Sequence, residues 1–351
     1  MKNTDKLKGF FSGIIFSVIL GVFALGVTVF AAPIANKISV IYDNIKIYVD
    51  GTLIQPKDAD GKTIKPFISK GITYVPVAAL SKALGKDVSW DGNTKSIYIG
   101  SKPDIKAKEV TVSNVNELYD ALGSNKHIKL KPGIYNISDL NQDYSNSKNI
   151  YWESVYDGNE LVLDGINNLT LEGLGDKPVE IVVEPRYADV FTFLSCRKIA
   201  LKNIKAGHTI EKGECAGGVL NFDSSKDIDI SDSILYGCGT YGIIANDTEN
   251  LTFKNSIIEE CTYGAMTISD CKNFMLANSI IRKCENYNLI EIDSSSNIIY
   301  DKCEISDNET SDILSVHLSN EIKFTNCKFK NNKSFSTDLF PNIDFTGTTF
   351  E

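Results

Sequence analysis

The chain has 351 residues, with 45 acidic against 36 basic side chains and a formal net charge of −9. This length predicts two or three domains, and an acidic body repels phosphate backbones, so nucleic acid is not an expected partner. With 42% apolar and 10% aromatic residues the chain can bury a sizeable core, which excludes wholesale disorder.

Residues 1–32 are typical of an export segment. Lys2, Lys6 and Lys8 give a basic start, and the run from Phe10 to Phe30 carries no charge. Small residues close the segment, as a signal-peptidase site requires, but the uncharged run is also long enough to span a membrane. The segment is therefore either a cleaved signal peptide or a retained anchor. We expect a secreted or cell-surface protein that meets a membrane only through this segment, if it stays uncleaved.

The segment 38–100 predicts a small α+β module. Val49-Asp50-Gly51 carries an Asp-Gly hairpin signal between alternating strands. Pro76 suits the first turn of a helix, and Gly85 stands where that helix would end. Two further strands are expected around the turn within 88–100.

The module resembles the bacterial stalk domain, also called the copper amine oxidase N-terminal-like domain. The resemblance lies in the sequence motifs VDG, TYVPV, ALG and VSWD followed by IYIG, in this order. Ala78 departs from that family, whose members often carry Arg there. The resemblance implies a spacer or wall-associated adaptor. No copper site is expected, because residues 33–103 contain no His, Cys or Met. The polar stretch 101–110 predicts a linker.

An internal repeat dominates the rest of the chain. Four successive segments of 23 or 24 residues align at 226–248, 249–271, 272–295 and 296–319, each with three short apolar-alternating stretches and polar corners. One such coil cannot bury its apolar face alone, whereas stacked coils share an interior. Residues 111–351 are therefore predicted to form a right-handed parallel β-helix, with an amphipathic helix over 114–123 capping its first coil.

The cysteines also recur with the repeat. Cys238, Cys261 and Cys284 occupy one position of successive coils, and Cys303 and Cys327 share a position with serines of earlier coils. Parallel thiols on adjacent rungs suit neither disulfide geometry nor a tetrahedral zinc site. We expect free, buried thiols that act as small apolar fillers, and neither metal nor cofactor.

Stacking also predicts where chemistry could lie. Aligning the third strands places Asp189, Gly218, Gly242 and Ala265 in one row, so the corner before these strands becomes a cleft lined by Tyr, Gly and Glu. Glycines let a ligand approach the backbone, and tyrosines offer flat faces to sugar rings. The candidate substrate-binding residues are Glu184, Asp189, Glu211, Glu214, Tyr236, Glu259, Glu260 and Tyr263.

A lyase for uronic-acid polymers would need a cation, a base and an acid, and Arg186, His208 and either Tyr187 or Tyr241 are candidates for these roles. A hydrolase would instead pair two of the carboxylates. The alternative is structural: His208 and Arg186 hold a long loop in place, and the Tyr/Gly corner is simply tight.

From about Asn114 onward the chain resembles the right-handed parallel β-helix, or pectin-lyase-like, superfamily. The sequence motifs that carry this resemblance are EPRYADV, AGHT, CAGGVL and LYGCGTYG. Its members include lyases, polygalacturonases and noncatalytic surface proteins, so the resemblance does not select an activity. We expect the cleft to bind an extracellular glycan or cell-wall polymer without turnover, or to be structural. The alternative is a polysaccharide lyase or glycoside hydrolase that acts on acidic glycans.

Overall fold

The computed structural model divides into two units, residues 1–102 and 103–351, which are described separately. The predicted export segment lies outside the described residues, and no helix of the described part is both long and apolar enough to cross a membrane. The structure describes residues 37–58, 61–91, 95–100, 106–142, 145, 147–210, 216–237, 239–333 and 335–351.

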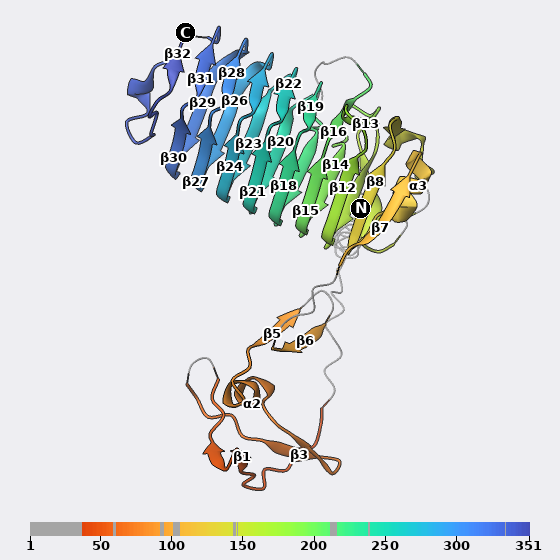
Figure 1. The fold of residues 1–351 in the computed structure, drawn as a ribbon, viewed down its shortest axis with the longest axis vertical. Coiled ribbons are helices and arrows are strands. Elements are labelled where there is room, and N and C mark those ends of the chain that lie inside the picture. The colour runs from red at the N-terminus through yellow and green to blue at the C-terminus, as the bar shows by residue number, and fades with distance from the viewer. Residues whose placement is uncertain are drawn as a thin grey trace, which may run out of the picture. The chain divides into compact units, whose positions relative to one another are not determined.

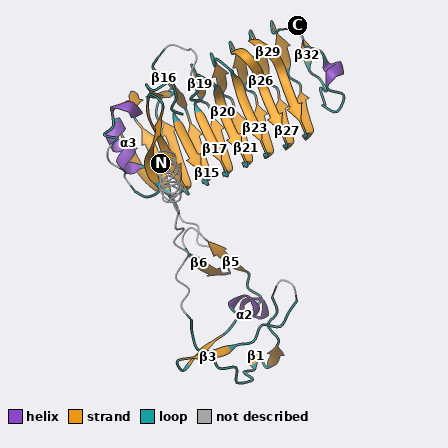
Figure 2. Ribbon diagram, turned by 180° about the vertical axis from the view of Figure 1, so that it is seen from behind, coloured by secondary structure: helices purple, strands orange, loops and turns teal. Residues whose placement is uncertain are grey.

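The described part of the first unit contains one short helix and three antiparallel hairpins (Figure 2). Asp50 and Gly51 both have positive φ, 48° and 78°, as a tight two-residue hairpin turn requires. Gly85, at φ 65°, follows the helix and ends it. The predicted α+β module is therefore present. Its elements are β1 (Ile47–Val49), β2 (Thr52–Ile54), β3 (Phe67–Ser69), β4 (Ile72–Tyr74), α2 (Val77–Ala83), β5 (Val88–Asp91) and β6 (Ser96–Ile99).

The second unit is a stack of coils in which each coil gives one strand to each of three long sheets (Figure 1). The chain runs from the first sheet to the second and the third, and then returns to the first one rung further along. The chain is mainly β and forms the right-handed parallel β-helix that the repeat predicts. Its first strand starts at Lys108, inside the stretch expected to be a linker.

The first sheet has its strands in chain order along the stack. They are β7 (Lys108–Val112), β8 (Lys126–Leu130), β12 (Asn167–Gly173), β15 (Arg197–Lys202), β18 (Lys226–Ser231), β21 (Glu249–Lys254), β24 (Lys272–Ala277), β27 (Ser296–Asp301) and β30 (Asn320–Thr325). The second sheet contains β9 (Ile134–Asn136), β13 (Val179–Val183), β16 (Ile204–His208), β19 (Ile234–Tyr236), β22 (Ile257–Glu259), β25 (Ile280–Arg282), β28 (Glu304–Ser306), β31 (Lys328–Lys330) and β32 (Thr349–Phe350).

The third sheet carries the residues of interest for function. It opens with an antiparallel hairpin, β10 with β11, and continues with parallel strands. Its strands are β10 (Ile150–Val155), β11 (Gly158–Asp164), β14 (Phe191–Leu194), β17 (Leu220–Asp223), β20 (Tyr241–Asn246), β23 (Gly264–Ser269), β26 (Glu285–Asp293) and β29 (Glu309–His317).

Apolar side chains of successive coils stack on one another inside the β-helix. In the first sheet Ile228 pairs with Leu251, which pairs in turn with Phe274. In the third sheet the rings of Phe193 and Phe222 stack at 5.1 Å between centroids. All five side chains are almost completely buried. The 23-residue period of the sequence is thus the period of the core.

Both ends of the stack are covered. At the start lies α3 (Val115–Ala121), whose N-cap residue Asn114 accepts a hydrogen bond from the amide of Glu117 through its side chain. Leu118, on the inner side of this helix, is buried. At the far end aromatic rings close the last coil, with Phe335 stacked on Phe350 at 5.7 Å. Two 3₁₀ turns, η1 (Ile137–Asp139) and η2 (Thr337–Leu339), complete the described elements.

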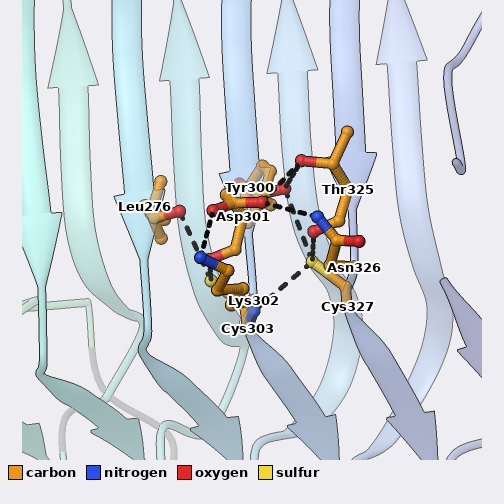
Figure 3. A network of polar contacts seen from close by, with 8 residues as sticks. All are labelled: Leu276, Tyr300, Asp301, Lys302, Cys303, Thr325, Asn326 and Cys327. Atoms are coloured by element: carbon orange, nitrogen blue, oxygen red, sulfur yellow. Dashed lines mark hydrogen bonds and ion pairs between the residues drawn. The ribbon is translucent and has the colours of Figure 1, made fainter. Parts of the chain in front are cut away.

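Polar side chains hold the corners between sheets. The amide of Ser233 donates to Ser256 Oγ on the next coil at 3.0 Å, and the amide of Cys303 donates to Cys327 Sγ at 3.4 Å (Figure 3). The described cysteines are free and buried, as predicted. Their expected role as apolar fillers is incomplete, because the thiols take the hydrogen-bonding place of serine. Cys238 lies outside the described residues, while Cys261 and Cys284 occupy one column.

Candidate functional site

Several of the candidate residues lie where the strands of the third sheet begin. The pairing places Asp189, Gly218, Tyr241, Gly264 and Asn288 in one row along the stack. We call this row, together with the side chains beside it, the third-sheet strip. Asp189 and Tyr241 are each followed by a glycine on the next coil, which leaves room for their side chains to lean along the stack.

This row corrects the sequence alignment by one residue. The alignment placed Gly242 beside Gly218, whereas the structure places Tyr241 there. The register is fixed from inside the β-helix, because Leu220 lies over Ile243 and both are buried. A shift of one residue would turn these side chains out of the core.

Asp189 is a buried carboxylate in this row, only 6% exposed. The amide of Gly218 donates to its Oδ1 at 2.6 Å, Asn221 Nδ2 donates to its Oδ2 at 2.8 Å, and the Thr192 hydroxyl donates to Oδ2 at 3.2 Å. Burial nevertheless raises the pKa of Asp189 above its usual value, against the effect of these hydrogen bonds. Asn221 Oδ1 is buried and has no hydrogen-bond partner among the described residues.

Glu160, on β11, is a second carboxylate beside Asp189 that the sequence analysis missed. Its Oε2 accepts a hydrogen bond from the amide of Asp189 at 3.1 Å, and its Oε1 lies 3.5 Å from the Thr192 hydroxyl. Burial, and then the negative charge of Asp189, raise the pKa of Glu160 to about 7. Glu160 and Asp189 form what we call the acid pair. The sequence signal for it was weak, because β10 and β11 lie outside the repeat.

The loop before β14 carries the predicted Arg186 and Tyr187. The backbone amides of both donate to the Asp157 carboxylate, at 2.7 and 3.1 Å, which ties this loop to the β10–β11 turn. The ring of Tyr187 lies 5.0 Å from that of Tyr156, which is 87% exposed. The predicted pair therefore belongs to an exposed aromatic site that includes a tyrosine the sequence analysis did not select.

His208 ends β16 and is buried, with 5% of its surface exposed. Its Nε2 lies 2.9 Å from the carbonyl oxygen of Ala188, and its Nδ1 has no hydrogen-bond partner among the described residues. Burial lowers the pKa of this imidazole, which favours the neutral ring. His208 thus connects the second sheet to the loop before β14 and does not face solvent as a surface base would.

Three tyrosines and a carboxylate follow along the strip. The rings of Tyr263 and Tyr287 meet edge to face at 4.8 Å between centroids. Tyr241 lies across Gly264, with its Cε1 3.0 Å from where a Cβ of that residue would stand. Burial, and then the charge of and a hydrogen bond to Glu291, raise the pKa of Tyr241 well above its usual value. We call Tyr241, Tyr263, Tyr287 and Glu291 the tyrosine cluster.

The remaining candidates that the structure describes do not join the strip. Tyr236, on the second sheet, donates to Glu180 at 2.8 Å, and Glu259 pairs with Arg282 at 2.7 Å. Glu260 lies 3.8 Å from Lys283. Glu184 accepts from Asn136 at 3.0 Å. Glu211 and Glu214 lie outside the described residues.

No group of three or more potential metal ligands was found within the described ranges. The strip consists of the acid pair, the exposed rings of Tyr156 and Tyr187, and the tyrosine cluster. It presents aromatic faces and carboxylates to a ligand. One of these acids, the partly buried Glu160, has a pKa of about 7.

Solved structures similar to this chain share little sequence with it. They include a "putative glycosyl hydrolase" from Parabacteroides merdae ATCC 43184, at 13% identity and a TM-score of 0.36, covering 56% of this chain and 96% of that one. The surface protein and adhesin PfbA of Streptococcus pneumoniae has 8% identity and a TM-score of 0.32, covering 69% and 86%. An alginate lyase from Paenibacillus sp. str. FPU-7 has 8% identity and a TM-score of 0.29, covering 69% and 99%.

No curated protein matches the chain. Two protein families do match parts of it. The family described as copper amine oxidase N-terminal domain matches residues 24–99 and 49–120, and the family described as right handed beta helix region matches residues 217–350. The chain thus carries a match to a copper amine oxidase N-terminal (stalk) domain followed by a match to a right-handed beta-helix region, and its second unit has the fold of a right-handed parallel β-helix.

Proposed function

We propose that this is an exported surface protein whose third-sheet strip binds an extracellular glycan without turnover. The observation that carries the proposal is the exposure of tyrosine rings along the strip. Tyr156 is 87% exposed, Tyr287 57% and Tyr187 38%. Large exposed aromatic rings cost solvation unless a partner covers them, and their flat faces suit sugar rings.

The direction of the strip also suits an extended polymer. Its rings come from the β10–β11 turn, the loop before β14, and strands β20 and β26, so they are distributed along the stack. A chain molecule lying parallel to the stack would contact several rungs, each about 4.8 Å from the next. Glycines in the row let such a ligand approach the backbone.

The position of the predicted base, His208, favours binding over lyase chemistry. His208 is buried against a backbone carbonyl and is not placed to remove a proton from a polymer on the surface. Tyr241 is held protonated by its surroundings, as the expected acid would be, but it cannot take the place of the missing base.

A second candidate, a glycoside hydrolase, is favoured by the acid pair. A general acid needs a raised pKa and a neighbouring carboxylate, and Glu160 has both, with a pKa of about 7 beside Asp189. Against this, Asp189 is almost fully buried and would reach a substrate only after the loop before β14 moved.

Retention and turnover separate the two candidates. The full chain is incubated with a panel of insoluble polysaccharides, and bound protein, reducing ends and unsaturated products near 235 nm are measured. Binding predicts retention on at least one polymer without product, weakened by Tyr287→Ala and Tyr187→Ala. The matched control is Tyr48→Ala in the stalk unit, where the side chain is 58% exposed.

The outcomes are distinct. Product formation abolished by Glu160→Gln would establish the hydrolase instead. Retention that is equal in the two strip variants and in the control would show that the strip is not the binding surface. No retention on any polymer would leave the β-helix a scaffold and overturn the proposal.

A further inference from the structure

We infer that the tyrosine cluster is a binding site for the protonated amine of an amino sugar, a ligand class that the carboxylate of Glu291 and the tyrosine rings recognise together. The inference rests on the proposed glycan binding and names the kind of sugar. It does not involve the acid pair.

The rings of the cluster converge from three successive coils. Tyr241 begins β20, Tyr263 precedes β23, and Tyr287 lies on β26. Tyr263 and Tyr287 are nearly perpendicular, at 79°, so the edge of one ring meets the face of the other. One ring lies across Gly264 and another is 57% exposed, so a ligand can contact the cluster from solvent.

Glu291 supplies the negative charge of the tyrosine cluster. It lies on β26 between the inward-facing Ile290 and Ile292, so its carboxylate is on the outer face of the third sheet. Asn288 Nδ2 donates to its Oε1 at 2.9 Å, and the phenol of Tyr241 also hydrogen-bonds to it. Among the described residues, no lysine or arginine forms an ion pair with Glu291.

The arrangement fits a cation better than a neutral or acidic group. An ammonium is attracted to the negative face of a tyrosine ring, and a hydrogen-bonded carboxylate adds a direct charge interaction. Asp312, level with Asn288 on the next coil, adds a further negative charge. The same charges repel a uronic acid, so we expect acidic glycans to be poor ligands for this part of the strip.

The test compares two oligosaccharides of equal length, one of glucosamine and one of N-acetylglucosamine, with the full chain in a calorimeter at low salt. Acetylation removes the positive charge and retains the ring. We expect the glucosamine oligomer to bind at least about tenfold more tightly, with a preference that decreases as salt is added.

Two substitutions locate the site. Glu291→Gln retains the shape of the side chain and is expected to abolish the preference for the amine. Tyr287→Ala, at an exposed ring, is expected to weaken binding of both oligomers. The control for lost charge is Glu304→Gln, an exposed carboxylate on the second sheet, which should leave both affinities unchanged.

Each outcome decides between the two proposals. Equal affinity for the two oligomers, with both weakened by Tyr287→Ala, would overturn the amine site and leave glycan binding in place. An amine preference that survives Glu291→Gln would also overturn it. If neither oligomer binds while the protein is retained on an insoluble polymer, the amine site is again wrong. Binding of glucosamine without retention on any polymer would leave the amine site and remove the broader proposal.

Discussion

The backbone amide of Asp189 donates to the carboxylate of Glu160 at 3.1 Å, although the two residues are 29 positions apart in the chain. Burial raises the pKa of both acids, that of Glu160 from 4.5 to about 7. Between pH 4.5 and about pH 7, the Glu160 carboxyl of the folded protein holds a proton that the same carboxyl has already lost in the unfolded chain. The free energy of unfolding therefore falls as pH rises from about 4.5 to about 7.

Replacing the acid should remove part of this pH dependence. We expect Glu160→Gln to flatten the slope between pH 4.5 and 7 and to stabilise the protein at pH 8 by on the order of 1 kcal/mol, a value reduced for partial solvent screening. Urea unfolding at a series of pH values measures it. Glu304→Gln, an exposed acid on β28 that does not contribute to the pKa of Glu160, is the control. An unchanged slope in the Glu160 variant would show that this carboxyl does not hold a proton in the fold.

A second prediction concerns Gly264, which has φ of 152° and stands where a Cβ would overlap the carbonyl oxygen of Asn288. Gly264→Ala should destabilise the β-helix by about 2–4 kcal/mol, because both the backbone conformation and the packing oppose a side chain. Gly133→Ala, whose new Cβ would have its nearest neighbour at 4.0 Å, should change stability by less than about 0.5 kcal/mol. Thermal unfolding of the two variants is the measurement, and equal effects would contradict the predicted contact.

The repeat made the fold predictable, because the alternation that buries Ile228 and Leu251 recurs every 23 or 24 residues and each coil repeats the same packing. It also placed polar side chains in columns. The row of the strip was misplaced by one residue, since its corner has few apolar side chains to fix the register. The burial of Leu220 over Ile243 and of Phe222 over Ala245 decides that register in the folded structure.

The acid pair could not be predicted in the same way. Glu160 lies on the β10–β11 hairpin, which interrupts the repeat, so no period relates it to Asp189. His208 was selected for its chemistry, but it is buried and lies against the Ala188 carbonyl of the loop before β14. Composition and spacing show which residues are present at an edge. They do not show which of them a neighbouring loop covers.

A third prediction follows from the corner columns. Ser256 Oγ accepts the amide of Ser233 at 3.0 Å and donates to the carbonyl of Lys254 at 2.7 Å, and the side chain is buried. Ser256→Ala leaves that amide without a partner and should cost about 1–3 kcal/mol. Ser256→Cys should cost less, because Cys303 and Cys327 occupy the same column. Equal losses in the two variants, measured by chemical unfolding, would show that a thiol does not replace the serine hydroxyl as hydrogen-bond acceptor at this corner.

The last prediction concerns thiol reactivity. The six described cysteines are buried, and burial raises the pKa of Cys196 to about 12 and that of Cys271 to about 11, so these two thiols are not ionised at neutral pH. Because the thiolate is the reactive form, both should react with an alkylating reagent far more slowly than free cysteine in the native protein.

Mass spectrometry after alkylation with and without denaturant identifies each labelled site. Cys215 and Cys238, which lie outside the described residues, serve as the internal comparison within the same chain. Denaturation without reductant should make all six described thiols reactive, because stacked corners hold them as free thiols. Rapid native labelling of Cys196 or Cys271 would contradict the buried corner, and protection that persists after denaturation would show that disulfides had formed in its place.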